Sequence, residues 1–229
     1  YVERDVRQVL NVTDLLAFQT FLGLAAGHTA QLTNLSALAA SAGITHNTAR
    51  AWLSVLEASF LVHRLAPLHA NLRKRLVKTP KLHFYDSGLA CYLLGIHTRE
   101  ELMSHPARGA IFESWVVAEI VKAHLHRWLE PRLSFYRDSQ QREVDLLIEA
   151  GQRLLAVEIK SGQTLASDFF HSVRDFTELL RERAPESHVS AALVHGGDAA
   201  HQRAGVAVVP WRATAGLVTG FLELENEER

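Results

Sequence analysis

The chain has 229 residues, a formal net charge of -1, 48% hydrophobic and 21% charged residues, which is ordinary for a globular protein and excludes extended disorder. The near-neutral charge gives no global indication of nucleic-acid binding, so such a role must depend on local patches. Because Cys91 is the single cysteine and no apolar run approaches about 18 residues, the sequence excludes a disulfide framework and a cysteine zinc site, and we expect a cytoplasmic protein that does not span a membrane.

Residues 1–28 show the spacing of apolar residues that is typical of helices that pack together. The chain begins with Tyr1 in what reads as the middle of a helix, so we expect it to be a fragment of a longer protein.

Residues 35–56 are predicted to form a helix-turn-helix. An Ala-rich helix leads to a turn at Gly43, and a second helix is capped near Thr45. In such motifs the first turns of the second helix enter the major groove of DNA. The candidate base-reading residues are His46, Asn47, Thr48 and Arg50.

Residues 60–65 and 71–85 are predicted to supply two strands around a basic loop and so to complete a winged helix. Residues 58–85 contain six Arg or Lys and no acidic residue, a local excess of positive charge that suits a phosphate backbone. The candidate phosphate contacts are Arg73, Lys74, Arg75, Lys78 and Lys81. The alternative is a winged helix that packs against a neighbouring domain.

A loop at residues 95–108 is expected to separate a domain at residues 1–100 from a domain at residues 101–229. In the second domain we predict a helix, a strand near residues 133–137, a β-hairpin, a long amphipathic helix, two further strands and a final helix. This alternation predicts an α/β/α sandwich, and the hairpin makes its sheet mixed.

The hairpin carries ionisable residues in strands that are otherwise apolar. Asp145 lies in the first strand, residues 143–148, and Glu158 and Lys160 lie in the second, residues 154–160. Side chains alternate between the faces of a strand, so Glu158 and Lys160 share a face, and the hairpin can bring Asp145 close to them. Two carboxylates beside an ammonium group suit Mg²⁺ or Mn²⁺ and favour metal-assisted hydrolysis of a phosphodiester.

A further carboxylate, Glu113, lies on a predicted helix that is apolar around it. The order of Glu113, Asp145, Glu158 and Lys160 resembles the PD-(D/E)XK nuclease superfamily. The resemblance implies a restriction-endonuclease-like fold in which the three carboxylates bind metal, while the lysine activates the attacking water. The helix after the motif lacks the Gln-x-x-x-Tyr pair of the RecB-like branch, and Phe176 stands near the place of the Tyr.

Several stretches resemble the C-terminal region of bacterial and archaeal AAA-type ATPases, a region classed as a domain of unknown function. They are residues 1–6, 52–58, 74–81, 84–89, 142–145 and 158–162. The resemblance implies an N-terminal ATPase domain as a partner in the full-length protein. This sequence contains no Gly-x-x-x-x-Gly-Lys-[Ser/Thr] motif, so we expect ATP to bind only in that other domain.

Three functions remain open at this point. The first is a Mg²⁺-dependent deoxyribonuclease whose winged helix binds DNA. The second is a non-catalytic module that binds DNA or a partner and retains the nuclease fold. The third is a winged-helix regulator in which Glu158 and Lys160 form only an ion pair, as opposite charges two residues apart on a strand often do.

Overall fold

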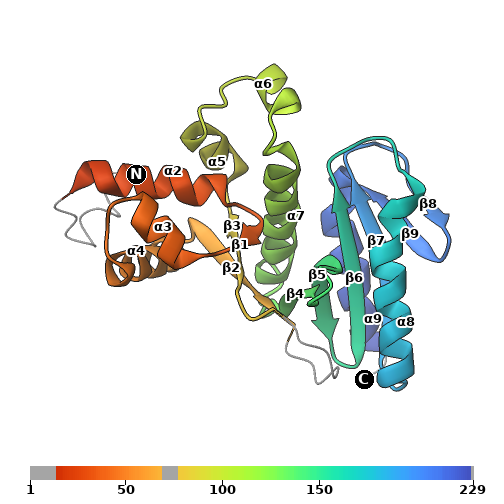
Figure 1. Cartoon of the computed structure of the whole chain (residues 1–229). Coiled ribbons are helices and arrows are strands. Elements are labelled where there is room, and N and C mark those ends of the chain that lie inside the picture. Colours follow the sequence, from red (N-terminus) through yellow and green to blue (C-terminus); the bar gives the residue numbers. More distant parts are fainter. Residues whose placement is uncertain (1–13, 69–76, 228–229) are drawn as a thin grey trace. The chain divides into compact units, whose positions relative to one another are not determined.

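The computed structural model describes residues 14–68 and 77–227, and these form two compact units (Figure 1). The described parts of the first unit are residues 14–65 and 79–115, and the second unit holds the rest. Relative to the domains expected at residues 1–100 and 101–229, residues 66–68, 77 and 78 lie in the second unit and residues 101–115 lie in the first.

The first unit combines helices with a small antiparallel sheet. Its elements are α2 (Leu15–Gly27), β1 (Gln31–Leu32), α3 (Leu35–Ser41), α4 (His46–Ala58), β2 (Val62–Pro67), β3 (Lys81–Phe84), α5 (Ser87–Leu93), α6 (Arg99–Ser104) and the first part of α7 (Arg108–Leu125). β3 lies between β1 and β2 and pairs antiparallel with both.

The two helices predicted at residues 35–56 are present as α3 and α4. Asn34 caps α3, because its side chain accepts the Ala37 N–H, and the Thr45 hydroxyl caps α4 in the same way. Gly43 has φ 69° in the turn between them, a conformation that glycine adopts without steric cost. The sequence prediction of this helix pair and its turn is confirmed.

The core of the first unit forms where α2 meets α4. The rings of Phe18 and Phe21 meet the Trp52 ring edge-on, with centroids 5.1 and 5.6 Å apart, an arrangement that aromatic rings favour. Ala39 on α3 and Ala49 on α4 are fully or nearly fully buried, and their small side chains let the two helices approach closely.

Some short elements were not expected from the sequence. α6 lies inside the stretch at residues 95–108 that we expected to be a loop, and Thr98 and Glu101 form a capping box at its start. β1 has two residues and β8 (His201–Arg203) has three. Elements this short have too few residues to show a period, so the sequence could not reveal them.

The second unit is built on a mixed sheet with the strand order β4-β5-β6-β7-β9-β8. Its elements after α7 are β4 (Leu133–Arg137), β5 (Glu143–Ala150), β6 (Arg153–Lys160), the 3-10 helix η2 (Ser167–Phe170), α8 (His171–Arg183), β7 (His188–His195), β8, β9 (Val206–Pro210), the 3-10 helix η3 (Trp211–Ala213) and α9 (Thr214–Glu227). β5 pairs antiparallel with β4 and β6, whereas β7 pairs parallel with β6 and β9. The prediction of an α/β fold with a mixed sheet is confirmed.

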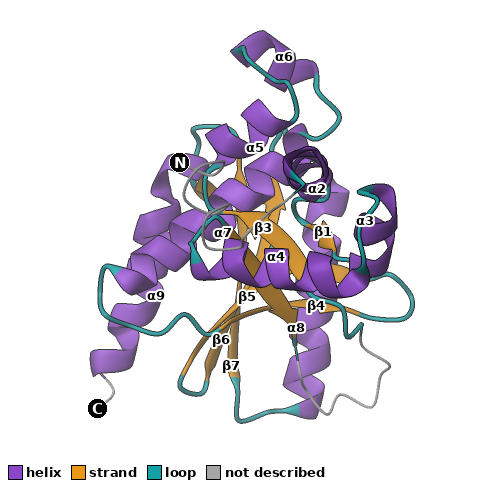
Figure 2. Cartoon of the chain, turned by 90° about the vertical axis from the view of Figure 1, so that its left-hand side faces the viewer, coloured by secondary structure: helices purple, strands orange, loops and turns teal. Residues whose placement is uncertain are grey.

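Helices cover both faces of this sheet, with α8 on one face and α9 on the other (Figure 1 and Figure 2). On the α8 face, Ala156 of β6 and Leu193 of β7 belong to the same apolar cluster as Val173 and Phe176 of α8. Glu158 is two residues beyond Ala156 and is the register partner of Leu193, so it lies on the α8 face as well.

None of the helices in the described part of the chain combines the length and the apolar character needed to cross a lipid bilayer.

Candidate metal and catalytic site

The hairpin places Asp145 and Glu158 opposite each other. Leu146 of β5 is the register partner of Val157 of β6, so one step further along the same register Asp145 faces Glu158. The Ile159 N–H donates a hydrogen bond to Asp145 Oδ2 at 2.8 Å. Asp145 is 9% exposed and Glu158 is 5% exposed, so two carboxyl groups share a small interior space.

Lys160 completes this cluster. Its Nζ lies 2.6 Å from Glu158 Oε1, and its side chain is 32% exposed. The ammonium group therefore lies at the border between the buried carboxyl groups and solvent. The hairpin thus brings together three of the four residues that the sequence singled out.

The electrostatic balance at Glu158 favours its neutral form. Burial raises the pKa of this carboxyl, the negative charge of Asp145 raises it further, and together they outweigh the lowering by Lys160, so that the pKa reaches about 8. Glu143, two residues before Asp145 on β5, also raises it. Glu158 Oε2 is buried and has no hydrogen-bond partner among the described residues. A proton or a cation beside this oxygen would relieve an unfavourable arrangement.

The carboxyl groups of Asp145 and Glu158 are oxygen ligands of the kind that a hard divalent cation prefers. Within the ranges that the structure describes, no group of three or more His, Cys, Asp or Glu side chains is placed to hold a metal ion. The carboxyl groups that the hairpin itself brings together are Asp145 and Glu158. Mg²⁺ is commonly held by one or two carboxylates, with water and substrate phosphates as its other ligands, so the pair fits Mg²⁺ or Mn²⁺.

Glu113 has a different partner in the first unit. Lys81 Nζ donates to Glu113 Oε1 at 2.8 Å, and the two side chains are 2% and 15% exposed. The metal-binding role expected of Glu113 stays a prediction. The placement of Lys81 is a correction, because we expected an exposed phosphate contact. β3 is the central strand of the small sheet, and the Lys81 side chain leaves it on the face where Glu113 of α7 accepts its hydrogen bond.

A buried polar network lies near this ion pair and had no signal in the sequence. The Ser114 hydroxyl is 2.7 Å from the Thr29 hydroxyl and 3.1 Å from His83 Nδ1. Burial lowers the pKa of His83 well below its ordinary value, and the nearby Lys81 and His63 lower it further. His83 is therefore neutral at physiological pH and acts as a structural hydrogen-bonding group.

The candidate base-reading residues lie at the start of α4. His46, Asn47 and Arg50 are exposed, whereas Thr48 is half-buried and its hydroxyl is 2.8 Å from that of Thr45. Among the candidate phosphate contacts of the loop, Lys78 is exposed. The other three, Arg73, Lys74 and Arg75, lie outside the described residues.

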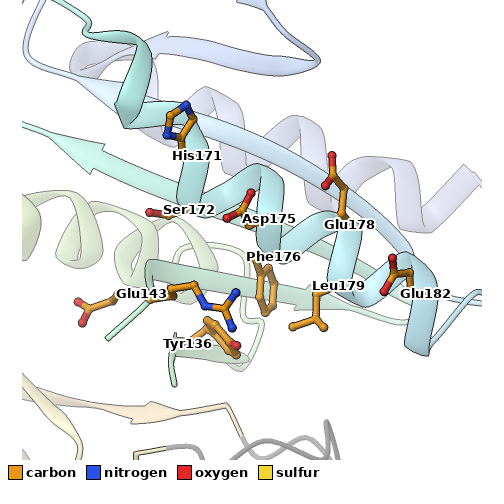
Figure 3. Close-up of a pocket in the computed structure, with 10 residues that line it drawn as sticks. Tyr136, Glu143, His171, Ser172, Asp175, Phe176, Glu178, Leu179 and Glu182 are labelled. Carbon is orange, nitrogen blue, oxygen red and sulfur yellow. The ribbon is translucent and has the colours of Figure 1, made fainter. Parts of the chain in front are cut away.

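A pocket of about 390 Å³ lies between α8 and the strands β4 and β5 (Figure 3). Its lining residues are Tyr136, Arg142, Glu143, His171, Ser172, Asp175, Phe176, Glu178, Leu179 and Glu182. Phe176 is 2% exposed and its ring centroid is 4.7 Å from that of Tyr136. It is therefore a core residue. Sequence reasoning overlooked Glu143, which is held by Arg137 at 3.0 Å.

The sequence matches two family models, both described as domains of unknown function: DUF8612 over residues 1–100 and DUF4143 over residues 108–214. Two curated relatives are the uncharacterized proteins Rv2008c of Mycobacterium tuberculosis and Mb2031c of Mycobacterium bovis, each 32% identical over 165 residues. The match covers 72% of this chain and 36% of each relative, so the matched part is little more than a third of each relative's length.

Proposed function

We propose that the second unit is a Mg²⁺-dependent nuclease centre of the PD-(D/E)XK type, in a restriction-endonuclease-like domain, and that it hydrolyses DNA phosphodiesters. One observation carries the proposal. Asp145 and Glu158 are buried opposite each other, and Glu158 Oε2 has no hydrogen-bond partner among the described residues. Ionising Glu158 beside Asp145 would place two buried negative charges against the single ammonium group of Lys160, so a divalent cation at this oxygen would stabilise the ionised pair.

Each residue has a definite part in the proposed reaction. A divalent cation held by Asp145 and Glu158 would act as a Lewis acid on the scissile phosphate. The hydrogen bond from the Ile159 N–H fixes the direction of the Asp145 carboxylate. Glu158 must lose its proton to bind the cation, so binding is stronger at higher pH. Lys160 is partly exposed and can orient the attacking water and offset the negative charge that develops on the phosphate.

The wild-type protein provides the first test. Mg²⁺ or Mn²⁺ at about 100 times its dissociation constant should stabilise the fold by roughly 2.7 kcal/mol, a rise in Tm of roughly 5–10 °C. Thermal unfolding is measured with each cation and with excess chelator, and the same samples are assayed for cleavage of single-stranded, duplex and branched DNA. Neither stabilisation nor cleavage with any of these substrates would contradict the proposal.

The structure also favours a second candidate, a non-catalytic module that binds DNA or a protein partner. Lys160 already neutralises part of the charge on Glu158, and the described residues hold two carboxylates in the cluster rather than three. If the wild type binds DNA tightly but neither binds a divalent cation nor cleaves, this second function replaces the first.

We propose that the first unit is a winged helix that binds DNA. The helix pair α3–α4 is followed by the antiparallel strands β2 and β3, as in winged helices. His46, Asn47 and Arg50 are exposed in the first turns of α4, the part of a recognition helix that contacts base edges. Lys78, an exposed lysine after β2, belongs to the second unit and is a separate candidate phosphate contact. Lys81 is left out of this set because it is buried.

DNA affinity should depend strongly on salt. Each phosphate contact made by Arg73, Lys74 or Arg75 should contribute roughly 0.9 to the slope of log affinity against log salt, so replacing all three by Ala should flatten that slope and weaken binding to every sequence. Binding is measured by fluorescence anisotropy over a range of salt concentrations. Arg99→Ala, at an exposed arginine on α6, is the control. Affinity that ignores salt would favour a protein-binding role.

We also propose that this chain works beside an AAA-type ATPase domain of a longer cytoplasmic protein. The support is the resemblance to the C-terminal region of such ATPases, together with the greater length of the mycobacterial relatives.

A further inference from the structure

The 3-10 helix η2 brings an aromatic ring back to the end of β6. The Phe169 ring centroid lies 5.5 Å from Lys160 Nζ, within the roughly 6 Å over which a cation is attracted to the face of an aromatic ring. The same ammonium group contacts Glu158 Oε1 at 2.6 Å. The ammonium group of Lys160 therefore has a carboxyl group and an aromatic ring as neighbours.

The backbone at Lys160 is held independently of its side chain. The Gly196 N–H donates to the carbonyls of Lys160 and Gly162, each at 3.1 Å. A Cβ at residue 196 would lie 2.3 Å from the Ser161 carbonyl oxygen, so the loop after β7 packs directly on the turn after β6. The position of the ammonium group therefore depends on the conformation of the flexible four-carbon side chain and on the groups that contact the ammonium group.

The position of Phe169 is set by the fold around it. Its neighbour Phe170 is 3% exposed and belongs to the apolar cluster that includes Val173 of α8. Arg203 of β8 donates to the Leu165 carbonyl at 3.3 Å, and its guanidinium lies 5.0 Å from the Phe170 ring centroid. These contacts anchor η2, so that the adjacent Phe169 ring is presented to Lys160.

We propose that Phe169 is a positioning residue for Lys160. Its ring holds the ammonium group beside Glu158 and at the exposed side of the carboxyl pair, and it does so without touching substrate or metal. A free lysine side chain samples many rotamers, and restricting it before the reaction removes part of the entropy that would otherwise be lost in the transition state. The kinetic part of this inference rests on the proposed nuclease function, whereas the contact itself belongs to the metal-free protein.

A spectroscopic experiment tests the contact without any enzyme assay. The solvent-accessible lysines, Lys160 among them, are reductively methylated with ¹³C, which keeps their charge, and the Lys160 signal is assigned with Lys160→Arg. In wild type, that signal should be displaced by the ring current of Phe169. Phe169→Leu should return it to the position of an exposed lysine, and Phe169→Tyr should restore the displacement.

The matched control is Phe221→Leu, which removes a buried ring from α9 and its contact with Arg153. It should lower Tm while leaving the Lys160 signal displaced, which separates a general loss of packing from the specific contact. An unchanged Lys160 signal in Phe169→Leu would overturn the inference.

Kinetics then test what the contact does. Phe169→Leu should lower kcat for DNA cleavage roughly tenfold, with KM and the metal concentration for half-maximal stabilisation unchanged, and Phe169→Tyr should recover most of the rate. Cleavage by Phe169→Leu at the wild-type kcat would overturn the positioning role. A wild type that cleaves no DNA but shows the ring-dependent Lys160 signal would refute the nuclease proposal and leave the structural contact established.

Discussion

Asp145→Asn should abolish cation-dependent thermal stabilisation and lower any DNA cleavage by roughly 1,000-fold, while DNA affinity stays unchanged. Asparagine keeps an oxygen that can accept the hydrogen bond from the Ile159 N–H, so the hairpin should fold as before. It removes the charge that faces Glu158, and a lone buried carboxyl is a poor ligand for a divalent cation. Thermal unfolding with and without Mg²⁺ or Mn²⁺, together with cleavage and anisotropy assays, measures all three properties.

Two companion variants make this result specific. Glu149→Gln removes a carboxylate from an exposed position on the same strand, and it should change neither cation binding nor cleavage. Lys160→Met should spare cation-dependent stabilisation and slow cleavage, because the proposed role of the lysine concerns the water and the phosphate. Retained cation stabilisation in Asp145→Asn would show that the cation binds elsewhere.

Glu158→Gln should stabilise the metal-free protein at pH 8–9 and change it little at pH 5. Burial and Asp145 raise the pKa of Glu158 to about 8 in the folded protein, against about 4.3 in an unfolded chain. Between these values the folded state binds more protons than the unfolded state, so this group makes the protein less stable as pH rises from about 4.3 to about 8. Glutamine carries no charge at any pH and should remove that loss.

A pKa that rises from about 4.3 to about 8 on folding costs roughly 5 kcal/mol at pH 9, and about 1 kcal/mol shifts Tm by roughly 2–4 °C for a chain of this length, so we expect Glu158→Gln to raise Tm by roughly 10 °C or more. Measuring between pH 7 and pH 9 avoids His63 and His83, whose pKa values are lowered by burial. Glu178→Gln, at an exposed position on α8, is the control and should not alter the pH dependence. If Glu158→Gln is instead less stable than the wild type across this range, the prediction is wrong, because Glu158 must then be ionised in the folded protein and stabilised by its neighbours.

The groups that act on Glu158 also explain why a cation should reverse the pH effect. Asp145 and Glu143 raise its pKa, while Lys160 lowers it. One lysine does not offset the effects of burial and of Asp145 on the pKa of Glu158. A divalent cation between Asp145 and Glu158 would add positive charge there and so favour the ionised form of Glu158. In wild type, saturating Mg²⁺ should therefore remove most of the decline in Tm between pH 7 and pH 9.

The amino-acid sequence by itself determined the parts of this protein that depend on near neighbours in the chain. The hairpin strands were predicted at residues 143–148 and 154–160 and are found at Glu143–Ala150 and Arg153–Lys160. A two-residue connection and the alternation of side chains are enough to bring Asp145 to Glu158 and to put Lys160 beside it. The α3–α4 pair could be predicted for a similar reason, because the capping residues and the turn glycine act on backbone groups only a few residues away in the sequence.

Only the tertiary structure decided the contacts between segments that lie far apart in the chain. Lys81 looked like one more charge of a basic loop, yet β1 pairs with β3 and the lysine is buried against Glu113. Phe176 packs in the core, while Phe169 lies by Lys160. Both aromatic residues occur in the same stretch of sequence, and their periodicity does not distinguish them. The two residues differ in burial because η2 ends before Phe176 and α8 then packs on the sheet. The burial of a side chain on α8 depends on which strands, distant in the sequence, lie against that helix.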